Sequence, residues 1–345
     1  MENKSICVTE NALDEILIED IFDNKGNILI AKNAIMNKYS VEFLSRLNIK
    51  EIYVYPSKEE SRLSKNNNFP LIYKENILAM QKIARRLAAG KGVAPDDLGE
   101  MSKILSIEIN KNSKMIGHTG RIKDTDEYTY NHSVNVAIYS VYIGRLLGLD
   151  DGRLRELCQA ALLHDIGKAK VPKDILNKKG KLTKEEFSIV KKHTIDGYVL
   201  SKGMSFLTEE VRDAILCHHE REDGSGYPYG IKGRKINLYA KILAITDVYD
   251  ALTSERAYKK KSTPFDAIEE FYNMGINKFS RPILNIFLKN ISQLYVNSKV
   301  ILNDGRVGKI EFIPPKDLTF PIINIHGEYI DLSTNPSLKI IGIVE

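Results

Sequence analysis

The chain has 345 residues, of which 43% are hydrophobic and 28% charged, so global disorder is excluded and two or three domains with sizeable cores are expected. A net charge of +5 allows an anionic ligand but is too small to indicate a protein that wraps nucleic acid. No apolar run of about eighteen residues and no secretory leader is present, so no membrane span is expected. Cys7, Cys158 and Cys217 lack disulfide or zinc-ribbon spacing, which favours the cytoplasm.

Residues 1–56 predict a small α+β module. The segment NKGNILIAKN indicates a turn and a strand, SVEFLSRLN a short helix, and IKEIYVYP a strand ended by proline. The polar residues 57–70 are expected to form a linker.

Residues 71–296 have helical periodicity throughout, whereas residues 297–345 have the pattern of strands. Turn signals at Asp304-Gly305 and His326-Gly327 predict two hairpins in this last segment. The predicted fold class is therefore mainly α: a helical bundle flanked by a small α+β N-terminal module and a small β-rich C-terminal module.

Histidines and aspartates stand at inward positions of these helices. His218 and His219 continue the apolar stripe that begins at Val211, and Asp165 continues the stripe of the helix before it. His193 is placed on the same face as Ile189, four residues earlier. Two further inward residues are Asp247, on a helix that is apolar nearly all round and hence central, and His132.

A buried carboxylate is costly unless a cation or a hydrogen-bond donor compensates it. A lone inward histidine is more often an ordinary core residue, but five histidines and two aspartates together are hard to satisfy with one another. Imidazole and carboxylate suit Fe, Mn, Zn or Ni, and seven ligands exceed the need of one ion. The pattern predicts two metal ions that share a carboxylate and hydrolyse a phosphate ester through a bridging hydroxide.

Three ordered motifs resemble those of the HD-GYP family, a branch of the HD phosphohydrolases that degrades cyclic di-GMP. They are HDIGK, HHEREDGSGYPYG and ITDVYDALTSERAYKKK, within a match over about residues 128–294. The resemblance implies a phosphodiesterase that yields linear pGpG, with GMP as a further product. A non-catalytic receptor for cyclic di-GMP and a hydrolase of another cyclic dinucleotide remain the alternatives.

The resemblance also implies roles for individual residues. Asp165 would bridge two ions, Fe or Mn before Zn, Ni or Mg, whose other ligands form two sets: His132, His164 and Asp247, and His193, His218 and His219. Lys168 would act in catalysis and contact the scissile phosphate, and Arg256 and Lys259 would hold substrate phosphates. Apart from the resemblance, the glycine-rich loop after His219 suggests that Tyr227 lines the entrance or stacks on a guanine. Tyr128 stands where some members carry a third-metal glutamate, so two ions are expected.

The expected partner is cyclic di-GMP, without a nucleic acid polymer. A homodimer and protein partners of the terminal modules are further expectations, which the sequence leaves open.

Overall fold

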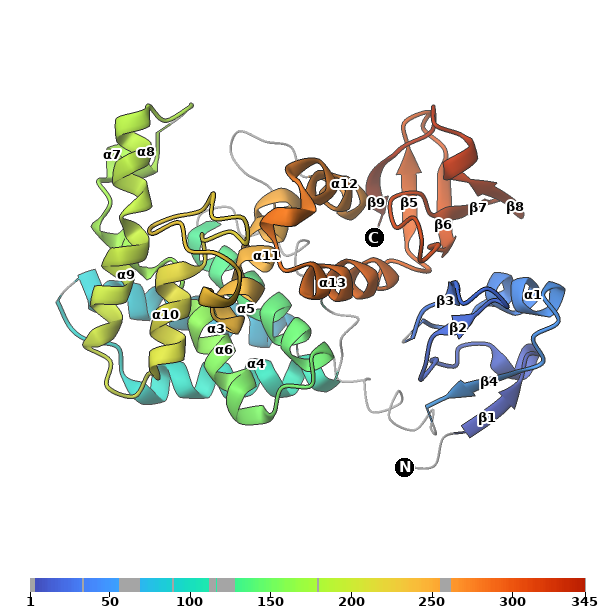
Figure 1. The fold of residues 1–345 in the computed structure, drawn as a ribbon, viewed down its shortest axis with the longest axis horizontal. Helices are drawn as coiled ribbons and strands as arrows, with labels where there is room; N and C mark the ends of the chain where they lie inside the picture. Colours follow the sequence, from blue (N-terminus) through green and yellow to red (C-terminus); the bar gives the residue numbers. More distant parts are fainter. Residues whose placement is uncertain are drawn as a thin grey trace. The chain divides into compact units, whose positions relative to one another are not determined.

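The computed structural model describes residues 4–32, 34–55, 69–88, 90–111, 116, 128–178, 180–254 and 262–344. The chain forms two compact units (Figure 1). One unit consists of residues 67–261 and 271–286, and the other of residues 1–66, 262–270 and 287–345. The helical unit is therefore inserted between two segments that fold together.

The helical unit is built mainly from α-helices that follow one another along the chain. They are α3 (Phe69–Ala88), α4 (Pro95–Lys111), α5 (Tyr128–Leu146), α6 (Asp151–Leu163), α7 (Lys173–Leu176), α8 (Lys184–Lys191), α9 (His193–Lys202), α10 (Glu209–Cys217) and α11 (Leu238–Thr253). A 3-10 helix, η4 (Ile166–Lys170), follows α6, and α12 (Pro264–Met274) and α13 (Arg281–Gln293) are shared by both units.

Helix α11 lies at the centre of this unit, which confirms the prediction from its apolar sequence. Ile242, Leu243 and Ile245 are completely buried, and these neighbouring positions point in different directions, so the helix is covered on more than one face. Asn237 caps its first turn by accepting a hydrogen bond from the backbone of Ala240. Helix α5 packs against α11, and the hydroxyls of Ser140 and Thr246 are 2.9 Å apart across this contact.

The predicted common face of Ile189 and His193 is wrong. Helix α8 ends at Lys191 and α9 begins at His193, so the four-residue periodicity does not continue across the junction. Ile189 is 37% exposed, whereas His193 is 1% exposed. Because a new helix begins at His193, this residue points inward although Ile189, on the preceding helix, is partly exposed.

The second unit contains two small antiparallel sheets and one larger one. β1 (Lys4–Cys7) pairs with β4 (Glu51–Val54), and β2 (Ile21–Phe22) pairs with β3 (Ile28–Ile30), beside helix α1 (Lys38–Arg46). The larger sheet has the order β8-β7-β6-β5-β9. Its strands are β5 (Lys299–Leu302), β6 (Val307–Phe312), β7 (Ile322–Ile325), β8 (Glu328–Asp331) and β9 (Ile340–Val344). Both predicted hairpins are present, as β5–β6 and β7–β8.

The two β-containing modules share one hydrophobic core, an arrangement that the sequence does not predict. Phe312 and Ile322 of the large sheet belong to the same cluster as Leu17 and Leu44 of the N-terminal module. The side chain of Asn37 also donates a hydrogen bond to the carbonyl of Glu311. The fold class is nevertheless the predicted one, with a mainly helical chain and two small flanking modules. No helix among the described residues is long and apolar enough to cross a membrane.

A glycine permits η4 to approach α9 closely. A Cβ atom on Gly167 would lie 1.9 Å from the carbonyl oxygen of His193 and 2.5 Å from the backbone nitrogen of Gly197. Both obstacles are backbone atoms of a helix, which cannot move aside as a flexible side chain can. Gly167 therefore sets the spacing between the HDIGK segment and the helix that begins at His193.

Gly167→Ala is expected to lower the free energy of unfolding by about 3 kcal/mol, because the added methyl group overpacks two backbones. Chemical denaturation of the full chain measures this change. Gly203→Ala is the matched control, since its Cβ atom would meet only the carbonyl oxygen of Leu200 at 3.5 Å. Equal stability of the two variants would contradict the close approach.

Candidate metal centre

The seven predicted ligands converge from five helices, mostly at the helix ends. His132 lies on α5 and Asp247 on α11. The other residues stand where helices begin or end: His164 and Asp165 after α6, His193 at the start of α9, and His218 and His219 after α10. Histidine and aspartate side chains at helix ends can thus meet at one point without interrupting the helical hydrogen bonds.

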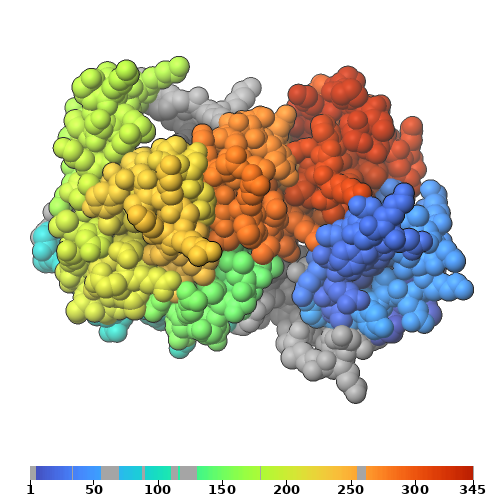
Figure 2. All heavy atoms as spheres, viewed as in Figure 1, coloured from blue at the N-terminus to red at the C-terminus, as the bar shows by residue number. Residues whose placement is uncertain are grey.

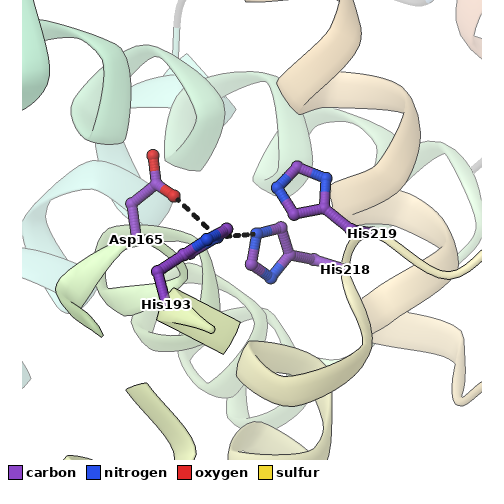
Figure 3. Close-up of side chains that lie close together, drawn as sticks. All are labelled: Asp165, His193, His218 and His219. Atoms are coloured by element: carbon purple, nitrogen blue, oxygen red, sulfur yellow. Dashed lines mark hydrogen bonds and ion pairs between the residues drawn. The ribbon is translucent and has the colours of Figure 1, made fainter. Parts of the chain in front are cut away.

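Asp165 lies between two sets of histidines. Its Oδ2 atom is 3.3 Å from Nε2 of His164 and 3.6 Å from Nε2 of His132. Its Oδ1 atom is 3.3 Å from Nε2 of His193. Figure 3 shows this second side of the carboxylate, with His218 and His219 beyond His193. Each oxygen of Asp165 therefore faces a different set of imidazoles, as a bridging carboxylate does.

The potential ligand atoms form two groups that share Asp165. One group is Asp165, His193, His218 and His219, and the other is His132, His164 and Asp165, with all ligand atoms in a group within 4.8 Å of one another. Asp247 contacts both groups, because its Oδ1 is 3.2 Å from Nε2 of His132 and its Oδ2 is 3.7 Å from Nδ1 of His219.

Backbone carbonyls orient three of the imidazoles. Nδ1 of His164, His193 and His218 lies 2.7, 2.7 and 2.8 Å from the carbonyl oxygen of the residue three positions earlier. A neutral histidine that donates Nδ1–H to a carbonyl has its lone pair on Nε2. In all three residues this arrangement directs a free lone pair into the cluster.

Unpartnered polar atoms show that this cluster fits a cation. Nε2 of His164 and Oδ1 of Asp165 are both buried and have no hydrogen-bond partner among the described residues. Buried polar groups without partners are rare in folded proteins, because desolvation is costly. A metal ion satisfies buried electron-pair donors of this kind, which have no proton donor beside them. The cluster has the nitrogen and oxygen donors that suit a divalent metal ion.

The electrostatics of the cluster keep most imidazoles neutral and the carboxylates ionised. Burial lowers the pKa of His193, lowers that of His219 to about 3, and lowers that of His218 strongly. Burial opposes ionisation of Asp165, but the charge of Lys168 and the neighbouring imidazoles hold the pKa of the carboxyl well below its usual range. Neutral imidazoles and an ionised carboxylate are the forms that bind metal.

Asp250 is a functional residue that sequence reasoning missed. It is completely buried, and its Oδ2 atom accepts a hydrogen bond of 2.7 Å from Nδ1 of His132. Asn135 donates to its other oxygen at 2.8 Å, and Tyr73 donates in turn to Asn135 at 2.8 Å. The available signal was its position one helical turn after Asp247, which places both carboxylates on the same face of α11.

The loop after the two histidines is fixed to the centre. Glu220 is buried, and its Oε1 atom accepts a hydrogen bond of 2.7 Å from the backbone of Tyr229. A Cβ atom on Gly226 would lie 2.4 Å from the carbonyl oxygen of His219, so only glycine fits this return of the chain. Tyr227 follows and stacks on His219, with ring centroids 4.7 Å apart.

Of the three predicted basic residues, the structure describes Lys168. The ammonium of Lys168 donates to Oδ2 of Asp165, and its side chain is 28% exposed. It therefore lies at the edge of the centre, accessible to a bound molecule. Arg256 and Lys259 lie outside the described residues.

A mainly helical unit with adjacent His-Asp ligands at its centre defines an HD-type metalloprotein. Residues 110–281 match the HD domain family. The chain is 36% identical over 232 residues to the cyclic di-GMP phosphodiesterase PA4108 of Pseudomonas aeruginosa, covering 67% of this chain and 56% of that protein. It is 41% identical over 142 residues to the 3'3'-cGAMP-specific phosphodiesterase 3 of Vibrio cholerae, covering 41% of this chain and 30% of that protein.

The fold is also found in a solved structure. Bd1817, an HD-GYP-type protein from Bdellovibrio bacteriovorus, aligns with a TM-score of 0.52 at 18% identity, covering 83% of this chain and 98% of Bd1817. The chain belongs to the HD-GYP family of HD-domain proteins. It spans little more than half the length of the Pseudomonas relative.

Asp250→Asn is expected to weaken divalent-metal binding by roughly 10- to 100-fold, because the carboxylate that orients His132 is lost. Titration of metal-free protein with Mn²⁺, followed by calorimetry, measures the affinity. Asp196→Asn, on the surface beside Lys170, is the control and is expected to bind normally. Unchanged affinity of Asp250→Asn would contradict the orienting role.

Metal loading is expected to release about one proton at neutral pH. Burial disfavours the charged form of His132, but its hydrogen bonds to Asp247 and Asp250 outweigh burial and raise its pKa to about 9. Below that pH an incoming ion must displace a proton, so affinity falls as pH falls, by up to about tenfold per unit. Calorimetry at one pH in buffers with different protonation enthalpies counts the proton, and identical heats would contradict this expectation.

Proposed function

We propose that the protein is a metal-dependent phosphodiesterase that hydrolyses the bacterial second messenger cyclic di-GMP to linear pGpG, with further cleavage to GMP. The observation that carries this proposal is Asp165, whose two oxygens face two different sets of histidines. This arrangement suits two adjacent ions, and two adjacent ions suit in-line displacement at a phosphodiester. The names of the Pseudomonas and Vibrio relatives support the same reaction class.

We assign the ligands of the two ions as the resemblance implied. One set is His132, His164 and Asp247, the other is His193, His218 and His219, and Asp165 bridges them. Bound ions would neutralise charge on the phosphoryl oxygens and lower the pKa of a shared water. The identity of the ions, Fe or Mn before Zn, Ni or Mg, stays a prediction.

The protein's own residues bind the substrate and stabilise its charge. Lys168 is held at the edge of the centre by Asp165, where its ammonium can contact the scissile phosphate and the leaving 3' oxygen. Asp250 and the three backbone carbonyls fix the imidazoles before substrate arrives, so no reorganisation is needed during the reaction. Arg256 and Lys259 are assigned to the other phosphate contacts.

Two alternatives differ from this proposal in measurable ways. A mixed cyclic dinucleotide as substrate is favoured by the name of the Vibrio relative, the 3'3'-cGAMP-specific phosphodiesterase 3. A receptor would bind cyclic di-GMP tightly without turnover. Anaerobic purification with metal analysis, followed by turnover of cyclic di-GMP and 3'3'-cGAMP side by side, separates the three functions.

The remaining expectations stay predictions. They are a homodimer, protein partners for the two β-containing modules, a cytoplasmic location, and domains at residues 1–56, 71–296 and 297–345 with a linker at 57–70.

Asp165→Ala is expected to abolish both metal loading and hydrolysis, because it removes a ligand from both groups. Metal content after purification and release of pGpG are the two measurements. Asp174→Ala, at an exposed position, is the control for purification and assay. Turnover that survives in Asp165→Ala would rule out the proposed mechanism.

A further inference from the structure

Two aromatic rings and one ammonium form a cluster beside the metal centre. Phe187 and Lys191 lie one turn apart on α8, and Tyr227 comes from the loop after His219. The Phe187 and Tyr227 rings are 6.4 Å apart at an interplanar angle of 80°. The Nζ atom of Lys191 is 4.8 Å from the centre of the Phe187 ring and 5.3 Å from that of Tyr227. We call these three residues the aromatic–lysine cluster.

The cluster adjoins the side of the centre that contains His193 and His219. Tyr227 stacks on His219, and its ring centroid is 6.4 Å from that of His193. Helix α8, which supplies the other two residues, belongs to the α7–α8 segment that projects from the helical unit (Figure 2). A molecule whose phosphate lies at the metal centre would therefore reach the cluster with the group attached to that phosphate.

The cluster is not accounted for by packing of the core. Phe187 is 44% exposed, so a large part of the benefit of burying an apolar side chain is not obtained. Phe187 and Lys191 alone would be an ordinary pair on a helix surface. Tyr227 is different, because it belongs to another segment and brings the pair into contact with a metal ligand. An exposed aromatic ring next to a cation is a common site for stacking a nucleobase.

We propose that the aromatic–lysine cluster binds one base of the cyclic dinucleotide and prefers guanine. This inference rests on the proposed function and deepens it. The base stacks on an aromatic ring and displaces the ammonium of Lys191 from the ring face to the edge of the base. Lysine is a donor only, and guanine presents two acceptors, O6 and N7, on that edge. Adenine presents a donor amino group in place of O6, so it leaves the ammonium poorly matched.

The preference has a defined consequence for different cyclic dinucleotides. Cyclic di-GMP and 3'3'-cGAMP can each place a guanine on the cluster. Cyclic di-AMP can offer only adenine. The cluster therefore discriminates against cyclic di-AMP and accepts both of the other molecules.

Lys191→Met tests this inference in the full, Mn²⁺-loaded protein. The ratio of kcat/KM for cyclic di-GMP to that for cyclic di-AMP is expected to fall by about tenfold, because the donor to guanine is lost. Phe187→Ala is expected to raise KM for both molecules by roughly tenfold, since stacking does not distinguish the bases. Lys192→Met, the exposed neighbour, is the matched control and should leave both values unchanged.

The ratio separates base recognition from general attraction of anions. An equal loss for both dinucleotides in Lys191→Met would show that the ammonium only attracts phosphate, and would overturn the inference. So would the same effect in Lys192→Met. Equilibrium binding of the same dinucleotides to the loaded variants is measured in parallel. Absence of turnover in the wild-type protein would contradict the proposed function, while a guanine preference in binding that Lys191→Met removes would still support the cluster.

Discussion

The burial of one carboxylate, that of Asp165, determines how the centre of the helical unit is built. An ionised carboxylate in a protein interior needs compensating positive charge, or it becomes protonated. Lys168 supplies part of that charge from the edge. Three of the histidines, His164, His193 and His218, contribute lone pairs rather than protons, because backbone carbonyls accept the proton on Nδ1. The cluster is therefore electron-rich on both sides of Asp165, which is the condition for holding cations.

This condition explains why helix ends gather at the centre. A ligand inside a helix points in one fixed direction, whereas the end of a helix lets the chain turn and present neighbouring residues to one point. His218 and His219 follow α10 in this way, and their rings are 4.1 Å apart. Periodicity and motif spacing predict these positions well, because the stripe of each helix continues into the ligands. The prediction fails for the common face of Ile189 and His193, because α8 ends at Lys191, between these two residues.

Other parts of the centre depend on contacts between residues that are far apart in the sequence, and the pattern of neighbouring residues could not predict them. Asp250 pairs with a histidine that is 118 positions earlier in the chain. The contact of Tyr227 with Lys191 and the narrow space at Gly167 likewise join segments whose spacing in sequence is unrelated to their spacing in the fold. The mainly helical fold class and the two hairpins were predictable, because a turn dipeptide between short strands is a local signal. The shared core of the two β-containing modules was not.

That shared core has a consequence for the order in which the protein folds during synthesis. The Asn37 side chain reaches a carbonyl 274 residues further along the chain, and Phe312 and Ile322 belong to the same hydrophobic core as the N-terminal module. The N-terminal module leaves the ribosome long before these partners exist, so its apolar face stays open while the whole helical unit is made. The helical unit can acquire its ligands first, and the two β-containing modules close last. Ribosome-bound chains are thus exposed to aggregation through the N-terminal module rather than through the metal centre.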